Sequence, residues 1–112
     1  MLNAEELKII INEAKKAAEI ASTTYLTEKL GGEDNFPCGF AWVNIFGVKG
    51  NTKQGKAFKA AGIEKDYNGA YSIWNPGNVN VQNVDVKSAG AEAAADVFTS
   101  YGFKAYAGSR LD

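Results

Sequence analysis

The first thirty residues carry apolar and small side chains at spacings that alternate between four and three, with charged residues between them. These positions are Leu7, Ile11, Ala14, Ala18, Ala21 and Tyr25. Because an α-helix has 3.6 residues per turn, this spacing places them along one stripe of a helix. Asn3 followed by Glu6 is a variant of the capping box that starts helices, and Gly31-Gly32 is typical of a helix end. The pattern predicts a helix over residues 4–30.

Such a helix would be about 40 Å long at 1.5 Å per residue, which is more than a small domain needs to cover one face of a sheet. Either the helix breaks near residues 22–24, where Ser, Thr and Thr crowd, or its small-residue stripe packs on a second copy of the chain. We favour the second copy, which makes residues 1–31 the oligomerisation element. In the plainer interpretation, the alanines only let the helix lie close to its own sheet.

Residues 39–48 alternate with the period of a β-strand. One side carries Phe40, Trp42, Asn44, Phe46 and Val48, and the other carries Ala41, Val43 and Ile45. Because both sides are apolar, we expect the central strand of a sheet. Asn44 is the exception, since burying an amide is costly unless its donor and acceptor are hydrogen-bonded. Either Asn44 bonds to nearby backbone, or it is a polar contact in a ligand pocket.

A short helix and a second strand follow. Residues 53–61 are predicted to be helical, with Asn51 or Thr52 as the cap and Gly62 at the end. Residues 69–75 are predicted to form a strand that has Tyr71 and Ile73 on one face and Ser72 and Trp74 on the other. This strand ends at residues 75–78, Asn-Pro-Gly-Asn, which is the residue order of a type II turn.

The last third of the chain predicts one more helix and one more strand. Residues 79–83 add a short strand or stay a loop, and a helix capped by Asp85 or Ser88 runs to about Tyr101. Residues 103–111 then form a strand with Tyr106, Gly108 and Arg110 on one side. The whole pattern predicts a single α+β domain over residues 1–112. One long and two shorter helices pack on a three- to four-stranded, mainly antiparallel sheet, and residues 37–112 form its α/β core.

The composition removes most familiar catalytic chemistry. The chain has 112 residues, no histidine and one cysteine, Cys38, so it cannot build a Ser-His or Cys-His nucleophile or a histidine metal site. Cys38 has no histidine to act as its base, and we interpret it as structural. The carboxylates each fit a cap, a turn or an exposed face, although an enzyme that uses carboxylates alone stays open. We expect a non-enzymatic protein with no metal and no cofactor.

The charge balance bears on the partners. The net charge is -1, from 12 basic and 13 acidic residues, so no overall field draws the protein to nucleic acid or to an anionic membrane. Charged residues interrupt the N-terminal segment early, and no apolar run approaches the roughly 20 residues of a membrane helix. We expect an intracellular protein with no membrane and no nucleic acid among its partners.

Residues 50–57, GNTKQGKA, fit part of the phosphate-binding loop of nucleotide hydrolases. Ala57 stands where that loop has a Ser or Thr for magnesium, and the chain is too short for the parallel sheet of such enzymes, so we exclude an ATPase or GTPase. The surrounding lysines either hold a phosphate at the helix N-terminus or form a solvated face. They are Lys49, Lys53, Lys56, Lys59 and Lys65.

Several residues are suited to hold a planar, phosphorylated ligand. Aromatic side chains that can stack on a base are Tyr71, Trp74 and Tyr106, together with Trp42; amides that can read its edge are Asn44, Asn75, Gln82 and Asn83; and Arg110 supplies a forked cation. We expect the turn region 75–85 and the last strand to converge on one pocket, completed by a neighbouring chain. The alternative is that these aromatic residues belong to the core.

Four strings resemble segments of a family of small tailed-phage and prophage proteins. They are PCGFAWVNI at 37–45, WNPG at 74–77, QNVDVK at 82–87 with AGA after it, and AYAGSRLD at 105–112. The size, the long first helix, the aromatic and amide residues and the terminal arginine are also similar to phage sponges that counter the Thoeris defence by sequestering a cyclic ADP-ribose signal. That resemblance implies a non-catalytic oligomer in which Arg110 holds phosphate and Trp74 or Tyr71 stacks on the base.

We therefore expect a phage accessory protein of the host cytoplasm that binds and sequesters a nucleotide-like signalling molecule. It would act as a homodimer or a higher homo-oligomer. The alternative is a protein-interaction module that inhibits or redirects a host protein through the long helix or the aromatic strand face.

Overall fold

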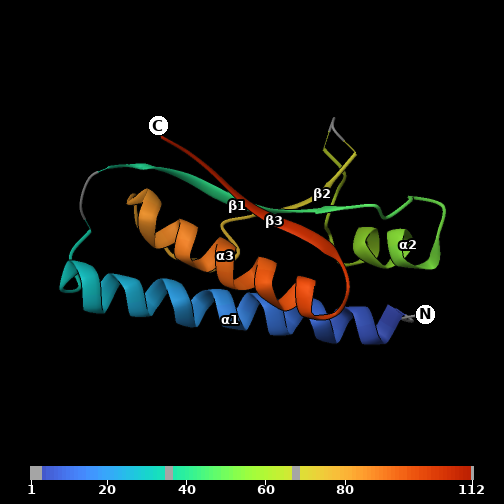
Figure 1. The fold of residues 1–112 in the computed structure, drawn as a ribbon, viewed down its shortest axis with the longest axis horizontal. Coiled ribbons are helices and arrows are strands. Elements are labelled where there is room, and N and C mark those ends of the chain that lie inside the picture. Colours follow the sequence, from blue (N-terminus) through green and yellow to red (C-terminus); the bar gives the residue numbers. More distant parts are fainter. Residues whose placement is uncertain (1–3, 35–36, 67–68, 112) are drawn as a thin grey trace.

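The computed structural model describes residues 4–34, 37–66 and 69–111, and it has the predicted α+β class. Three helices accompany a three-stranded antiparallel sheet with the strand order β2-β1-β3 (Figure 1). In chain order the elements are α1 (Ala4–Leu30), β1 (Gly39–Phe46), α2 (Lys53–Ala60), β2 (Tyr71–Trp74), α3 (Val84–Ser100) and β3 (Lys104–Leu111). The predicted helix and strand positions are therefore confirmed, with β1 in the centre of the sheet.

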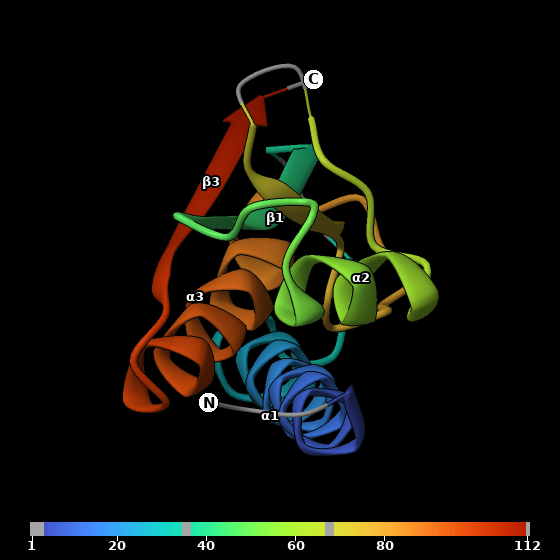
Figure 2. The same ribbon diagram turned by 90° about the vertical axis from the view of Figure 1, so that its right-hand side faces the viewer.

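All three helices lie on the same side of the sheet (Figures 1 and 2). Figure 2, which looks along α1, shows α3 beneath the strands, α2 to one side of α3, and α1 below both helices. Ala41, Val43 and Ile45 of β1 point toward the helices and are buried, whereas the alternate residues of β1 stay partly exposed. The other face of the sheet carries no helix among the described residues.

The long helix is continuous, and its small-residue stripe packs on α3 of the same chain. Ala14, Ala18 and Ser22 are fully buried, and the Ser22 hydroxyl donates a hydrogen bond to the Val86 carbonyl oxygen of α3 at 2.8 Å. A Cβ on Gly90 of α3 would lie 2.4 Å from Ser22 Oγ. The alternative of a break near residues 22–24 is therefore wrong, because the helix is continuous and Ser22 packs on α3. The stripe also lies neither on the sheet nor free for a second copy.

The turn after β2 is not of type II. The Asn78 N–H donates to the Asn75 carbonyl oxygen at 2.8 Å, but the positive φ angles belong to Asn75 (44°) and Asn78 (51°), not to Gly77. Glycine is needed at 77 for space, since a Cβ there would lie 2.5 Å from Ser22 Oγ. Gly77 is therefore not required for its backbone angles, as a type II turn would predict. It is required because its lack of a side chain lets the turn approach α1.

The N-cap of α2 lies where the sequence predicted it, whereas the N-cap of α3 lies earlier than predicted. Thr52 caps α2 as predicted. The cap of α3 is Asn83, not Asp85 or Ser88, because the Asn83 Oδ1 accepts the Val86 N–H at 3.0 Å. Residues 79–82 form no strand, and the only pairing near them is an isolated bridge between Asn83 and Cys38 within the described chain. The Asn-rich segment therefore serves to start α3.

Candidate functional site

The sheet face that no helix covers gathers aromatic and basic side chains, and we call it the open face. Strand alternation brings these residues to one side, and the antiparallel register places them in neighbouring rows. The open face consists of Phe40, Trp42, Asn44 and Phe46 of β1, Ser72 and Trp74 of β2, and Lys104, Tyr106, Gly108 and Arg110 of β3.

Four of these residues form a contact cluster at one end of the open face, which we call the ring–arginine cluster: Phe40, Trp42, Trp74 and Arg110. The ring centroids of Trp42 and Trp74 are 5.0 Å apart, and those of Phe40 and Trp74 are 6.2 Å apart in an edge-on arrangement. The guanidinium carbon of Arg110 lies 5.3 Å from the Phe40 centroid and 6.0 Å from the Trp74 centroid. Arg110 of β3 therefore reaches across β1 toward β2.

The register explains how the cluster assembles. Phe40 lies opposite Arg110, and Trp42 lies opposite Trp74 on one side and Gly108 on the other. A Cβ on Gly108 would come within 2.6 Å of the Trp42 Nε1, so the indole of Trp42 lies against the backbone of β3. Trp74 is 56% exposed. The Trp42 ring is thus held against β3, whereas the Trp74 ring is exposed to solvent.

A second cation stands beside this cluster from below the sheet. Lys87 of α3 is buried, its Nζ donates to the Gly39 carbonyl oxygen at 2.9 Å, and the same Nζ lies 5.2 Å from the Phe40 ring centroid. Phe40 therefore has two cationic groups close to it, Lys87 and Arg110. Of these two groups, Arg110 is exposed and can meet an anion from solvent, whereas Lys87 is buried.

The middle and the far end of the open face differ from the cluster. In the middle, the Ser72 hydroxyl donates to the Asn44 Oδ1. The amide of Asn44 is thus bonded to a side chain on β2, not to nearby backbone as the plainer interpretation proposed. At the far end, Phe46 and Tyr106 form a second ring pair with centroids 6.0 Å apart, and Tyr106 is 62% exposed.

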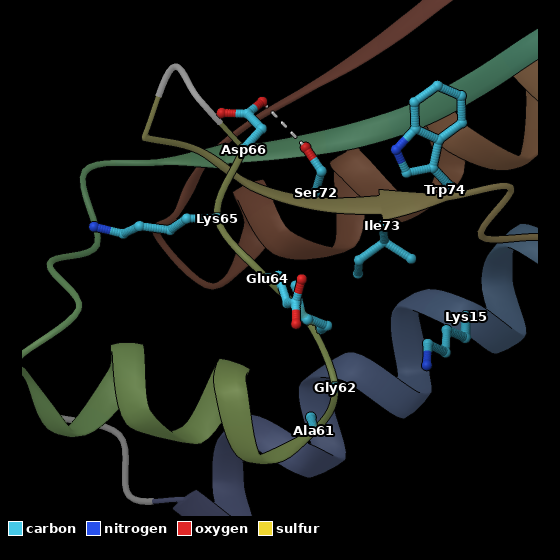
Figure 3. Close-up of a pocket in the computed structure, with 10 residues that line it drawn as sticks. Lys15, Ala61, Gly62, Glu64, Lys65, Asp66, Ser72, Ile73 and Trp74 are labelled. Atoms are coloured by element: carbon cyan, nitrogen blue, oxygen red, sulfur yellow. Dashed lines mark hydrogen bonds between the residues drawn. The ribbon is translucent and has the colours of Figure 1, made fainter.

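A cavity of about 440 Å³ opens beside Trp74, between β2, α1 and the residues that follow α2. Figure 3 shows Lys15, Glu64 and Trp74 around it, with the Ser72 Oγ 3.4 Å from a carboxylate oxygen of Asp66. The cavity is therefore lined by charges of both signs. Its size lies in the range of small-molecule sites.

A neighbouring cavity of about 420 Å³ shares Lys15 and Trp74 with the first and extends to Asn75. The Asn75 Nδ2 donates to the Val79 carbonyl oxygen at 3.0 Å, whereas its buried Oδ1 has no hydrogen-bond partner among the described residues. Trp74 borders both cavities, but its indole lies on the open face, on the other side of β2 from Lys15 (Figure 3). Neither of these two cavities includes Asn83 or Arg110.

Half of the predicted ligand residues share the open face, namely Asn44, Trp74, Tyr106 and Arg110, but of these only Trp74 and Arg110 are in the ring–arginine cluster. Tyr71 instead points into the core, where its ring stacks on Phe58 at 4.9 Å.

The three remaining predicted residues lie elsewhere. Asn83 is the buried cap of α3, Gln82 is exposed in the loop before it, and Asn75 is in the turn packed near α1. The turn region and the last strand do not converge as expected, because they flank β1 on opposite sides. Sequence reasoning missed Phe40, Lys15 and Lys87. The alternation of β1 already placed Phe40 beside Trp42, but no local signal marks either lysine.

The segment that resembles a phosphate-binding loop is occupied by its own contacts. The Thr52 Oγ1 accepts the Gly55 N–H at 3.1 Å and caps α2. A Cβ on Gly55 would lie 2.2 Å from the Lys49 carbonyl oxygen, so close packing accounts for glycine at this position. Of the nearby lysines, Lys65 lies with its Nζ 5.5 Å from the Tyr71 ring centroid. We place no anion there.

Comparison of the chain with protein-family models, with curated proteins and with solved structures gave no match. Within residues 4–34, 37–66 and 69–111, no group of three acidic, cysteine or histidine side chains is placed to hold a metal ion. No helix in this described part is long and apolar enough to cross a membrane.

Proposed function

We propose that this protein binds a planar, anionic, nucleotide-like ligand at the ring–arginine cluster and holds it without transforming it. The observation that carries the proposal is the position of the Arg110 guanidinium, 5.3 Å from the Phe40 ring and 6.0 Å from the Trp74 ring on an uncovered sheet face. A stacking surface and a forked phosphate donor thus stand next to each other, which is the pairing that a nucleotide requires.

A base stacked on the exposed indole of Trp74 would have Arg110 beside it on the open face. Lys15 lies on the other side of β2, toward α1 (Figure 3), so we do not include it in this site. The absence of histidine from the sequence supports binding without catalysis, because the most common general base is not available.

The resemblance to phage sponges suggests which ligands to try first. It would make the protein a counter-defence factor that sequesters a cyclic ADP-ribose isomer in the host cytoplasm. Cyclic ADP-ribose combines an adenine ring with a pyrophosphate, and Trp74 and Arg110 can serve one group each. The proposed site does not depend on this choice, since any nucleotide offers the same two groups.

Isothermal titration calorimetry with cyclic ADP-ribose isomers, cyclic oligonucleotides and mononucleotides tests the proposal. We expect one of these ligands to bind, and Arg110→Ala and Trp74→Ala each to weaken it at least about tenfold, the loss of one charge-assisted or stacking contact. The recovered ligand should be chemically unchanged by chromatography. Binding of none of them, or an affinity that neither substitution alters, would refute the proposal.

Two control variants make this test specific. Lys104 lies on the same strand and the same face as Arg110 but at the far end, so Lys104→Ala should leave the affinity within about twofold. Arg110→Lys keeps the charge and removes the fork, and it should recover only part of the affinity. A Lys104→Ala effect as large as that of Arg110→Ala would show a diffuse charge effect instead of a site.

A protein-interaction module is the second candidate, and the Phe46–Tyr106 pair favours it. These two rings are exposed at 37% and 62% and lie away from the ring–arginine cluster, and exposed aromatic residues are typical of interface hot spots. Pull-down from host lysate separates the candidates. A stoichiometric protein that is lost with Tyr106→Ala supports the interaction module, whereas a co-purifying nucleotide supports the binding site.

A further inference from the structure

Among the described residues, no strand pairs with the backbone hydrogen-bonding groups on the outer side of β3. The Asn75 N–H donates to the Ala41 carbonyl oxygen at 2.9 Å, and the Gly39 N–H donates to Gln82 at 3.0 Å. Odd-numbered residues of β1 therefore direct their backbone groups away from β3, and even-numbered residues direct theirs toward it. In an antiparallel pair only alternate residues exchange these bonds.

It follows that even-numbered residues of β3 bond to β1, and odd-numbered residues point their N–H and C=O groups outward. The outward set is Ala105, Ala107, Ser109 and Leu111. β3 is an edge strand, and in the described part of the chain no further strand pairs with it.

This edge lacks several of the features that normally protect one, although β3 carries two charged residues, Lys104 and Arg110. The opposite edge, β2, has four residues, and the bridge between Lys65 and Tyr71 covers part of it. β3 has eight residues in unbroken register with β1, without proline or bulge, and its outward set is uncharged. Its large apolar residues Tyr106 and Leu111 are 62% and 67% exposed. A long, regular edge of this kind is a template for another strand.

The side chains of β3 fit a second copy of the same strand. Around a two-fold axis, facing residues must lie on the same sheet face, so the axis passes through a residue. The middle of β3 lies between Ala107 and Gly108. An axis at Ala107 places Lys104 opposite Arg110, which repels. An axis at Gly108 places Tyr106 opposite Arg110, a favourable cation–ring pair that occurs twice.

We propose that two copies of this chain pair β3 to β3, antiparallel, about an axis at Gly108, and so form a continuous six-stranded sheet. The two open faces then become one surface, and Tyr106 of the second copy lies beside Arg110 of the first. The partner therefore adds a ring to the ring–arginine cluster. Self-association uses the sheet edge, and α1 stays packed on α3.

Amide exchange measured by NMR at several protein concentrations, with sedimentation for the mass, tests the pairing. The amides of Ala107 and Ser109 should exchange slowly in the dimer and at least tenfold faster after dilution to the monomer. The amides of Tyr106 and Gly108, which bond to β1, should stay protected at every concentration and are the internal control. A monomer at all concentrations, or a dimer whose Ala107 and Ser109 amides exchange rapidly, overturns the proposal.

Substitutions test the register without ligand. Ala107→Pro removes an outward N–H in each copy and should lower the association constant about tenfold or more, whereas Ala107→Ser keeps the N–H and should not. In the Gly108 register, position 107 faces position 109. Ala107→Lys combined with Ser109→Glu should therefore strengthen association about threefold. In the Ala107 register two lysines would meet instead, and weaker association of this double variant overturns the Gly108 axis even if Ala107→Pro fails to fold.

Discussion

Gly90 allows α3 to approach α1, and replacing it gives the sharpest test of the helix packing. A Cβ at this position would lie 2.4 Å from Ser22 Oγ and 3.1 Å from the Ala18 carbonyl oxygen. Gly90→Ala must therefore displace the Ser22 hydroxyl, which is the group that donates to the Val86 carbonyl oxygen at 2.8 Å. The substitution inserts a methyl group and breaks a buried hydrogen bond in one step.

The magnitude follows from three contributions. Overpacking costs about 1–3 kcal/mol, and the lost hydrogen bond costs about 1 kcal/mol. Alanine in place of glycine within a helix returns about 1 kcal/mol. We expect Gly90→Ala to lower the free energy of unfolding by about 2 kcal/mol. In a Ser22→Ala background the hydroxyl is already gone, so the same substitution should change that free energy by less than about 1 kcal/mol.

Urea unfolding of the four proteins of this cycle, followed by far-UV circular dichroism, gives the coupling free energy. Gly77→Ala is a matched comparison, since its Cβ would lie 2.5 Å from Ser22 Oγ but also 3.1 Å from Ser22 Cβ, which Ser22→Ala leaves in place. Ser22→Ala should therefore offset a smaller part of the destabilisation caused by Gly77→Ala than of that caused by Gly90→Ala. If Gly90→Ala costs the same with and without the Ser22 hydroxyl, the packing argument is wrong.

Three further predictions concern a cap, a ring contact and a titration. Asn83→Ala should lower the free energy of unfolding by about 1 kcal/mol in chemical denaturation, and Asn83→Ser should restore most of it. Gly108→Ala would bring a Cβ to 2.6 Å from the Trp42 Nε1, so it should shift the tryptophan fluorescence and cost about 1–3 kcal/mol. The hydrogen bond that the Tyr101 hydroxyl donates to Glu13, reinforced by the Glu13 charge, raises the pKa of Tyr101 above 10.0. Its stabilising effect is therefore complete below pH 10 and is lost as the pH rises through the raised pKa; in ultraviolet titration, Glu13→Gln should lower that pKa.

The sequence predicted most of the fold because the pattern of each element is local. The three-four spacing of α1 and the strict alternation of β1 and β3 identify elements and faces before any contact is known. The same alternation placed Asn44 with Trp42, and Tyr106 with Arg110. It could not tell which apolar face of β1 meets helices, because aromatic residues suit a core and an open platform equally well.

The sequence predicted only half of the residues on the open face correctly, because contacts between strands cannot be derived from local patterns. Trp74 and Arg110 are far apart in the chain, and only the register of both outer strands on β1 brings them together. Tyr71 is an aromatic residue of β2 like Trp74, but its side chain lies on the opposite side of this short strand and stacks on Phe58. Asn83 is polar and follows a loop, yet its amide caps a helix.

The sequence by itself thus determined the elements, the central position of β1, the two faces of each strand and the lack of histidine chemistry. Only the tertiary structure decided that the small-residue stripe of α1 packs on α3, that one face of the sheet stays open, and that Arg110 meets Trp74 there. Periodicity is set by neighbouring residues along the chain, whereas the packing partner of a face depends on contacts between segments far apart in the sequence.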